Sequence, residues 1–176
     1  NKAIAYSGRG TALTVGGNSL ATGKPYIQYE LQACGGGAVD GDDGIEGVQG
    51  GPHGCSRTIK SVPIEILESE FSSRILKYEL IPDTGGAGRF RGGLGSTREY
   101  LVVGDEARVV LRGNRCAATG VEGGLPGAEN YVEIIRGGQN ERLFRASGLV
   151  LKKGDVLRLV SGGGGGVGNP VERDRQ

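Results

Sequence analysis

Hydrophobic and polar residues alternate along much of this chain over short stretches, a spacing typical of β-strands. In the segment 26–31, for example, Gln28 and Glu30 face the opposite side of the predicted strand from Ile27 and Tyr29. Similar short-period patterns predict strands at residues 62–68, 75–81, 98–103, 107–112, 131–136, 141–145 and 155–161. Turns that contain glycine separate nearly all of these segments, so the chain resembles a series of short strands joined by tight connections.

Helical periodicity is hard to find in the same sequence. Residues 65–76 could form a turn or two of helix, but β-branched residues and serines in this stretch make a long helix unfavourable. The pattern therefore predicts a mainly β protein, a glycine-rich β-sandwich or barrel-like domain with little helix. We expect residues 1–176 to form a single domain.

Composition agrees with many turns and excludes several partner classes. The 176 residues include 36 glycines, which are interleaved with aliphatic residues rather than arranged in a collagen-like triplet. Formal net charge is +1, from 21 basic and 20 acidic residues, so neither nucleic acid nor an anionic membrane is an expected partner. No signal peptide, long apolar run or lipidation motif is evident, which predicts a cytoplasmic location. Because the chain opens on Asn1 and lacks methionine, we expect it to be part of a longer polypeptide.

The three cysteines provide little catalytic or metal chemistry. Cys34, Cys55 and Cys116 are odd in number and widely spaced, which argues against a disulfide framework and favours reduced thiols. His53 and Cys55 could supply two zinc ligands or a nucleophile with its base, but no second histidine and no Cys-x-x-Cys motif accompanies them. A loop histidine beside a small buried thiol is the favoured interpretation.

An acidic turn offers a second possible metal site. Asp40, Asp42 and Asp43 place three carboxylates within four residues of a glycine-dense segment, 35–44. Oxygen ligands of this kind suit a hard cation such as calcium, but the closing glutamate of a calcium loop is absent. A solvated turn in which the aspartates accept bonds from their own backbone is favoured, and no metal site is predicted.

Two further glycine-dense segments, 81–100 and 162–168, suggest an anion cradle. Consecutive glycines allow backbone N–H groups to converge on an anion, and Arg89 and Arg91 could add charge-assisted contacts. Neither segment has the GxxxxGK[ST] order of a phosphate-binding loop, and the sequence after Gly95 continues as a strand rather than as the helix of a dinucleotide site. Phosphate binding by these loops alone is therefore not favoured.

A resemblance to a known family accounts for the glycine segments more completely. In chain order, the runs are GGGAVDGDDGIEGV, VPIEILE, IPDTGGAGRFRGGLGSTREY, GVEGGLPGAEN and LKKGDVLRLVSGGGGGVGNPVERD. Together they resemble the C-terminal portion of the B-type subunit of the hydantoinase, 5-oxoprolinase and acetone or acetophenone carboxylase family. The similarity covers about residues 35–174, and several motifs in the same order make it more specific than any one glycine loop.

The resemblance implies an ATP-consuming complex. A hydantoinase A-like subunit binds ATP and phosphorylates the substrate, and the B-type subunit completes the reaction. This chain would then be part of a cyclic-amide hydrolase of the hydantoin or 5-oxoproline type. Alternatives are a ketone carboxylase segment or a non-catalytic scaffold that organises the complex. ATP and a divalent metal would bind outside this chain, the latter in the remaining N-terminal part of the B-type subunit. We expect the isolated chain to be inactive.

Family motif positions supply the candidate site residues, and none of them is assigned a catalytic role. Arg89, Arg91 and Asp83 are the candidates for contact with substrate, although an internal ion-pair and hydrogen-bond set that fixes the loop is the favoured interpretation. The other motif positions are Asp43, Glu65, Gly85, Gly86, Gly92, Gly93, Gly163, Gly164 and Arg173. The family commonly carries asparagines before the proline and glutamate motif, where this chain has residues 57–61, RTIKS. That departure leaves the substrate branch open.

Overall fold

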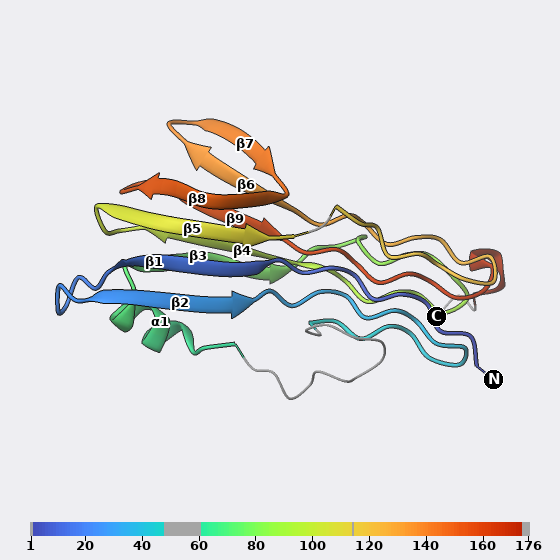
Figure 1. Ribbon diagram of the computed structural model, residues 1–176. Helices are drawn as coiled ribbons and strands as arrows, with labels where there is room; N and C mark the ends of the chain where they lie inside the picture. The colour runs from blue at the N-terminus through green and yellow to red at the C-terminus, as the bar shows by residue number, and fades with distance from the viewer. Residues whose placement is uncertain (1, 48–60, 114, 174–176) are drawn as a thin grey trace.

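A computed structural model describes residues 2–47, 61–113 and 115–173, and its strands form two antiparallel sheets that face each other (Figure 1). The four-stranded sheet has the order β2 (Pro25–Leu31), β1 (Ala12–Asn18), β5 (Glu106–Arg112) and β8 (Arg145–Lys152). The five-stranded sheet has the order β3 (Ser73–Leu80), β4 (Ser96–Val102), β9 (Val156–Val160), β6 (Tyr131–Arg136) and β7 (Gln139–Leu143). The prediction of a mainly β sandwich is confirmed.

Seven of the predicted strands are present with shifted or matching ends, and one prediction is wrong. Residues 62–68 were expected to form a strand, but helix α1 occupies Ile64–Glu70. This helix begins after Pro63, carries Glu65 in its first turn, and buries Leu67 against the sandwich. Proline before a helix and an acid in the first turn both favour helix over strand. The expected turn or two of helix lies here, and it ends at Glu70 rather than extending to residue 76.

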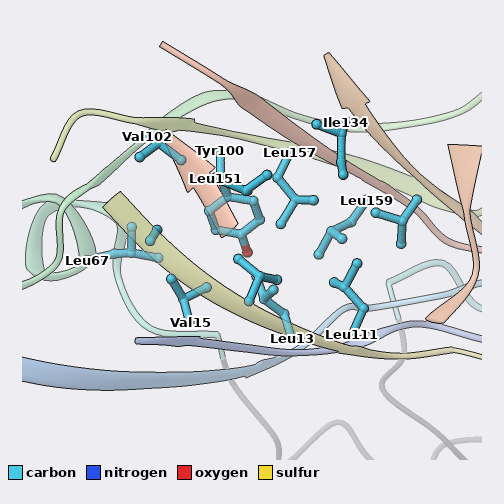
Figure 2. Close-up of a cluster of buried hydrophobic side chains, with 13 residues drawn as sticks. Leu13, Val15, Leu67, Tyr100, Val102, Leu111, Ile134, Leu151, Leu157 and Leu159 are labelled. Carbon is cyan, nitrogen blue, oxygen red and sulfur yellow. The ribbon is translucent and has the colours of Figure 1, made fainter. Parts of the chain in front are cut away.

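The hydrophobic core fills the space between the two sheets (Figure 2). Alternate residues of the strands point inward, as the side-chain period of two requires. Leu13 and Val15 come from β1, and Leu157 and Leu159 come from β9. Further core members are Leu67, Tyr100, Val102, Ala107, Val109, Leu111, Val132, Ile134 and Leu151. In the described part of the chain no helix is long and apolar enough to cross a membrane.

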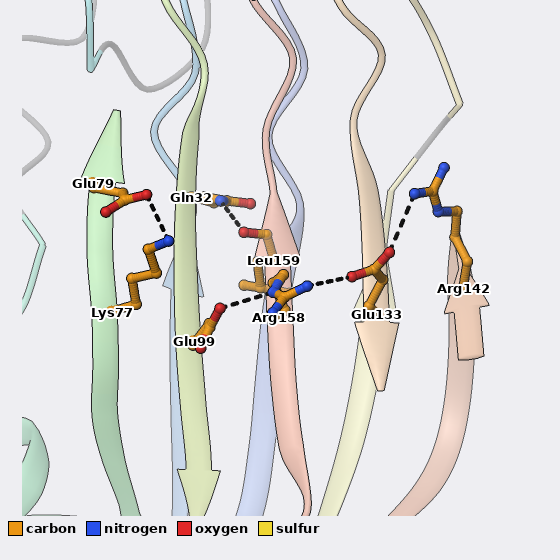
Figure 3. A network of polar contacts seen from close by, with 8 residues as sticks. All are labelled: Gln32, Lys77, Glu79, Glu99, Glu133, Arg142, Arg158 and Leu159. Atoms are coloured by element: carbon orange, nitrogen blue, oxygen red, sulfur yellow. Dashed lines mark hydrogen bonds and ion pairs between the residues drawn. The ribbon is translucent and has the colours of Figure 1, made fainter. Parts of the chain in front are cut away.

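A row of charged side chains crosses the outer face of the five-stranded sheet (Figure 3). Arg158 on β9 bonds to Glu99 on β4 and to Glu133 on β6, each at 2.8 Å. Arg142 on β7 donates to Glu133 as well, at 3.2 Å. Opposite charges on neighbouring strands stabilise an antiparallel sheet, so this row supports the register of β4, β9, β6 and β7.

Beyond the sandwich, the glycine-rich segments continue side by side as a bundle of extended chains (Figure 1). Residues 162–168 lie in the middle of it, and around them lie segments that include residues 6–9, 35–38, 84–93 and 119–128. The three glycine-dense segments that the sequence separates are therefore parts of one structure. They are held by backbone hydrogen bonds between segments that are not sheet strands.

Hydrogen bonding of the central segment repeats every three residues. Gly162 and Gly165 donate to the carbonyls of Arg9 and Tyr6, at 2.9 and 2.8 Å. Two residues further along from each, the N–H groups of Gly164 and Val167 donate to the carbonyls of Gly93 and Phe90, both at 2.9 Å. A period of three with bonds only to neighbouring chains is the geometry of an extended polyproline II-like helix and not of a β-strand.

Glycine is required in this bundle because the backbones approach one another too closely for a side chain. A Cβ atom built on Gly163 would lie 1.9 Å from the carbonyl oxygen of Thr84, and one built on Gly164 would lie 1.9 Å from that of Gly36. The motif glycines Gly85, Gly86, Gly92 and Gly93 are constrained in the same way, with backbone oxygens 2.0, 2.1, 1.9 and 2.3 Å from an added Cβ. Close approach of backbones is thus the reason for these glycines.

Candidate functional site

Charged residues from three of the sequence motifs meet beside residues 170–172, which lie at the end of the glycine bundle away from the sandwich (Figure 1). Asp43 receives two hydrogen bonds from Arg173, Nη1 to Oδ1 and Nη2 to Oδ2, both at 2.7 Å. Its Oδ1 also accepts a bond from the backbone N–H of Arg91 at 2.7 Å. Arg173 completes the set by donating to the carbonyl of Arg89 at 3.1 Å. We call Asp43, Arg89, Arg91 and Arg173 the tip cluster.

Local structure places each member of the tip cluster. The turn that carries Arg89 and Arg91 is tied to the central segment because Phe90 and Val167 exchange backbone bonds, both at 2.9 Å. The one-turn helix η1, Pro170–Glu172, brings Arg173 back over that turn. Its N-cap is Asn169, whose side-chain oxygen accepts the N–H of Val171 at 3.1 Å, a typical cap for a helix that opens on proline.

Electrostatics in the tip cluster keep Asp43 ionised. The hydrogen bonds from Arg173 are the largest cause, and the Arg91 N–H adds to them, so the pKa of Asp43 lies below its ordinary value. Arg173 responds in the opposite direction: the Asp43 carboxylate raises the pKa of this guanidinium. Both side chains are partly exposed, at 43% and 37%, so the pair serves to fix geometry more than to add stability.

A surface hollow of about 360 Å³ lies beside the tip cluster. Its lining includes Arg89, Phe90, Asp42 and Glu172. The Arg89 guanidinium lies over the ring of Phe90, 5.5 Å from the centroid, which holds the charge at the rim. The hollow therefore presents both a cation and carboxylates, an arrangement suited to binding a polar group. Its described lining includes no serine or cysteine that could act as a nucleophile.

A comparison of the sequence with family models decides the family. Residues 1–170 match the model described as Hydantoinase B/oxoprolinase. The chain belongs to this family. It is also 32% identical, over 145 residues, to the B-type subunit of a putative D-/L-hydantoinase from a Pseudomonas species, an alignment that covers 75% of this chain and 24% of that protein.

Solved structures of two enzymes share the fold. An ATP-dependent caprolactamase from Pseudomonas jessenii superposes with a TM-score of 0.76 at 24% identity, over 97% of this chain and 31% of that one. A nucleotide-free acetone carboxylase gives a TM-score of 0.71 at 20% identity, over 93% and 26%. The chain spans 20% and 24% of the length of two curated relatives that it matches, so it corresponds to a minor part of each.

The remaining predicted residues of this hydantoinase B family chain lie elsewhere. Asp83 adopts φ 58° in the turn after β3, beside Thr84, whose hydroxyl donates to Ile81 and accepts from Gly95 at 2.7 and 2.8 Å. Glu65 is on α1, at the sandwich. Within residues 2–47, 61–113 and 115–173, Asp83 forms no ion pair with either arginine, so the interpretation of an Asp83, Arg89 and Arg91 ion-pair set is wrong. Asp43 is the carboxylate at that turn. Contact of any of these residues with substrate stays a prediction.

The acidic turn does not gather ligands for a metal. Asp43 is occupied by Arg173 and the Arg91 backbone, and Asp42 contributes its backbone to a bridge with Val39. Across the described ranges, no group of three or more histidine, cysteine or acidic side chains is close enough to hold an ion. Cys34 is buried and Cys116 is exposed. The His53 and Cys55 pair and residues 57–60 lie outside the described part of the chain.

Sequence reasoning missed a buried charged network inside the sandwich. Arg98 donates to Glu30 at 3.1 Å, and the hydroxyl of Tyr100 bonds to the same carboxylate oxygen. The guanidinium also lies 4.7 Å from the ring centroid of Tyr78. Burial is the main cause that raises the pKa of Tyr100 well above its ordinary value, and the charge of Glu30 adds to it, so the phenol remains a donor. The sequence signal that could have indicated this network was the alternation of polar and apolar residues in β2. The polar residues lie on the buried side of this strand: Ile27 is 78% exposed and Glu30 only 6%.

Proposed function

We propose that this chain is the C-terminal β-rich segment of a B-type subunit in an ATP-dependent cyclic-amide hydrolase, and that it acts with an ATP-binding, hydantoinase A-like partner. The observation that carries the proposal is the family match over residues 1–170. The relatives named for hydantoinase and caprolactamase support the cyclic-amide branch, because hydantoins and caprolactam are both cyclic amides.

The chemistry explains why such a complex needs ATP. An amide carbonyl is a poor electrophile, and transfer of a phosphoryl group to its oxygen makes the carbon open to attack by water. The ring C–N bond then breaks and its nitrogen takes a proton, which leaves an acyl phosphate. A second water cleaves this acyl phosphate to the carboxylate and inorganic phosphate. Negative charge that accumulates during these steps has to be stabilised by fixed donors and cations. The ATP that is consumed in the reaction and a divalent metal would bind outside this chain, in the partner and in the rest of the subunit.

In the proposal, the contribution of this chain is to hold the complex in shape. The described residues provide no paired acid and base at the tip, and the tip cluster satisfies its own carboxylate with Arg173 and Arg91. The close-packed glycine bundle forms a rigid arm between the sandwich and the tip cluster. Such an arm is suited to placing the tip against a neighbouring part of the assembly. A cytoplasmic location fits this role and stays a prediction.

An ATP-consumption assay of the complete complex tests the function and its alternative. We expect phosphate release to depend on a cyclic amide, with hydantoin, 5-oxoproline and caprolactam assayed separately. Release that depends on acetone or acetophenone together with bicarbonate, and on no cyclic amide, would assign the chain to a ketone carboxylase instead. The chain without its partners serves as the control and should release no phosphate.

Substitution of Arg89 and Arg91 with alanine tests the scaffold role. Arg91 acts on Asp43 through its backbone N–H, which alanine retains, so the loop should keep its position. We expect turnover of the assembled complex to stay within about threefold of the unmodified complex, about 0.7 kcal/mol in barrier height.

Arg173→Ala is the variant for comparison with the Arg89 and Arg91 substitutions. It removes both side-chain bonds to Asp43, which those substitutions leave in place. A fall of about a hundredfold in turnover in the Arg89 and Arg91 variant, on the order of 3 kcal/mol, with assembly intact by size-exclusion chromatography, would reject the scaffold role. It would show instead that these arginines contact substrate or its phosphate.

A further inference from the structure

Five arginines gather on one surface where the four-stranded sheet meets the glycine bundle. They come from segments far apart in the sequence: the stretch before β1, the end of β5, the loop after β5, the end of β7 and the start of β8. The five are Arg9, Arg112, Arg115, Arg142 and Arg145. None belongs to the tip cluster or to a family motif identified in the sequence. We call this group the arginine surface.

The arginine surface is hollowed in two adjoining places. One hollow, of about 680 Å³, is lined by Arg115, Arg142 and Arg145, and the other, of about 470 Å³, by Arg9, Arg112 and Arg145. Gly113 and Arg145 line both hollows, so the two are neighbours. Hollows of this size suit small molecules rather than single ions.

Three of the guanidinium groups are held in position before any ligand arrives. Arg115 bonds to Glu129 at 2.8 Å, and its guanidinium lies 5.6 Å from the ring centroid of Phe144. Arg142 stacks on Tyr131, 3.8 Å from the ring centroid, and bonds to Glu133 in the charged row of Figure 3. Such contacts reduce the conformational entropy that a flexible arginine loses on binding.

Arg145 is fixed from the backbone side, because its Nε donates to the carbonyl of Gly113 at 3.1 Å. That bond places the guanidinium at the boundary of the two hollows, where it can face a ligand in either one. Arg145 thus links the two halves of the arginine surface.

Positive charge on this surface exceeds the negative charge beside it. Glu129 bonds to Arg115, and Glu133 bonds to Arg142 and is shared with Arg158. Among the described residues, the exposed guanidinium groups of Arg9 and Arg112 have no carboxylate partner. Close cations that are not neutralised raise the local concentration of anions.

We propose that the arginine surface binds the phosphate groups of a small phosphorylated molecule or of inorganic polyphosphate. Guanidinium forks match phosphate oxygens in pairs of hydrogen bonds, and several forks on one surface suit a ligand with more than one phosphate. Five of the ten residues that line the two hollows are arginines, a density of positive charge that suits a small anion with several phosphate groups. The inference does not depend on the proposed function.

Calorimetric titration of the whole chain with pyrophosphate, ATP and inorganic phosphate at low salt tests the proposal. We expect pyrophosphate and ATP to bind more tightly than phosphate, with affinity falling as salt rises. In Arg9→Ala/Arg112→Ala both affinities should fall about tenfold or more, since charge-assisted bonds to two unpaired cations are lost. Comparable losses for pyrophosphate and ATP would show that phosphate is the recognised group. A loss confined to ATP would overturn the proposal, because pyrophosphate would then bind without these arginines.

Arg74→Ala is the matched control, because Arg74 is an exposed arginine on β3 outside the arginine surface. Its binding should equal that of the unmodified chain. The proposal is overturned if neither pyrophosphate nor ATP binds the unmodified chain, if the double variant binds as well as the control, or if a polyglutamate peptide binds more tightly than pyrophosphate. Far-ultraviolet circular dichroism of each variant confirms that the fold is unchanged.

Discussion

Replacing Gly164 with alanine is expected to lower the free energy of unfolding by at least about 3 kcal/mol. The added Cβ would lie 1.9 Å from the carbonyl oxygen of Gly36 and 2.8 Å from the backbone nitrogen of Gly37. Since these contacts are with backbone, no side chain can rotate away, and the neighbouring segment has to move. That movement would break the bonds from Gly93 to Gly36 and from Gly36 to Ile45, at 2.8 and 2.7 Å. Urea denaturation of both proteins measures the effect.

Gly16→Ala is the matched control within the same chain. Gly16 lies in β1, and the nearest atom to an added Cβ is the carbonyl oxygen of Tyr26 at 3.8 Å, an ordinary contact. Its free energy of unfolding should change by less than about 1 kcal/mol, because alanine is tolerated in a strand where there is room. Equal effects of the two substitutions would show that the bundle is not as closely packed as the structure has it.

The second large effect is expected from Arg98→Ala in the buried network. Arg98 and Glu30 are 2% and 6% exposed, so the substitution leaves the Glu30 carboxylate buried without its cation. Removing one member of a buried pair costs about 3–5 kcal/mol, most of it the penalty for the remaining charge. Thermal and urea unfolding should both show the loss.

Two comparisons separate the charge effect from lost packing. Arg108→Ala removes an exposed pair with Glu106, whose side chains are 73% and 47% accessible, and should change stability by less than about 1 kcal/mol. The double replacement Glu30→Leu/Arg98→Met removes both charges and should be far less destabilising than Arg98→Ala alone. A double variant as unstable as the single one would mean that Arg98 acts through packing, not charge.

Strand periodicity predicted most of the sandwich because alternation is a local property of the sequence. It missed β1 and β8, where glycines interrupt the pattern: Gly16 and Gly17 in the first and Gly148, with φ 68°, in the second. Strand order and register depend on contacts between residues far apart, such as Leu13 opposite Leu111, which no short window contains. Turn chemistry also could not show that the glycine segments pack together.

The candidate site was predicted in part, through its motifs. Asp43, Arg89, Arg91 and Arg173 were each identified as motif positions, and the structure brings them together across 130 residues of sequence separation. Asp83 was grouped with the arginines because it is near them in sequence, but proximity along a chain does not determine which carboxylate a fold supplies. The sequence could not predict the buried partners of Glu30, because they lie on the other sheet.

The three-residue period of the central segment sets a rule for how its length can vary. Insertion of one residue would rotate everything beyond it by about a third of a turn, so that each N–H would face the wrong neighbour. An insertion or deletion of three residues would restore the orientation and shift the segment along its axis by one full repeat, about 9 Å. Homologous chains should therefore differ in the length of this run by multiples of three, or not at all.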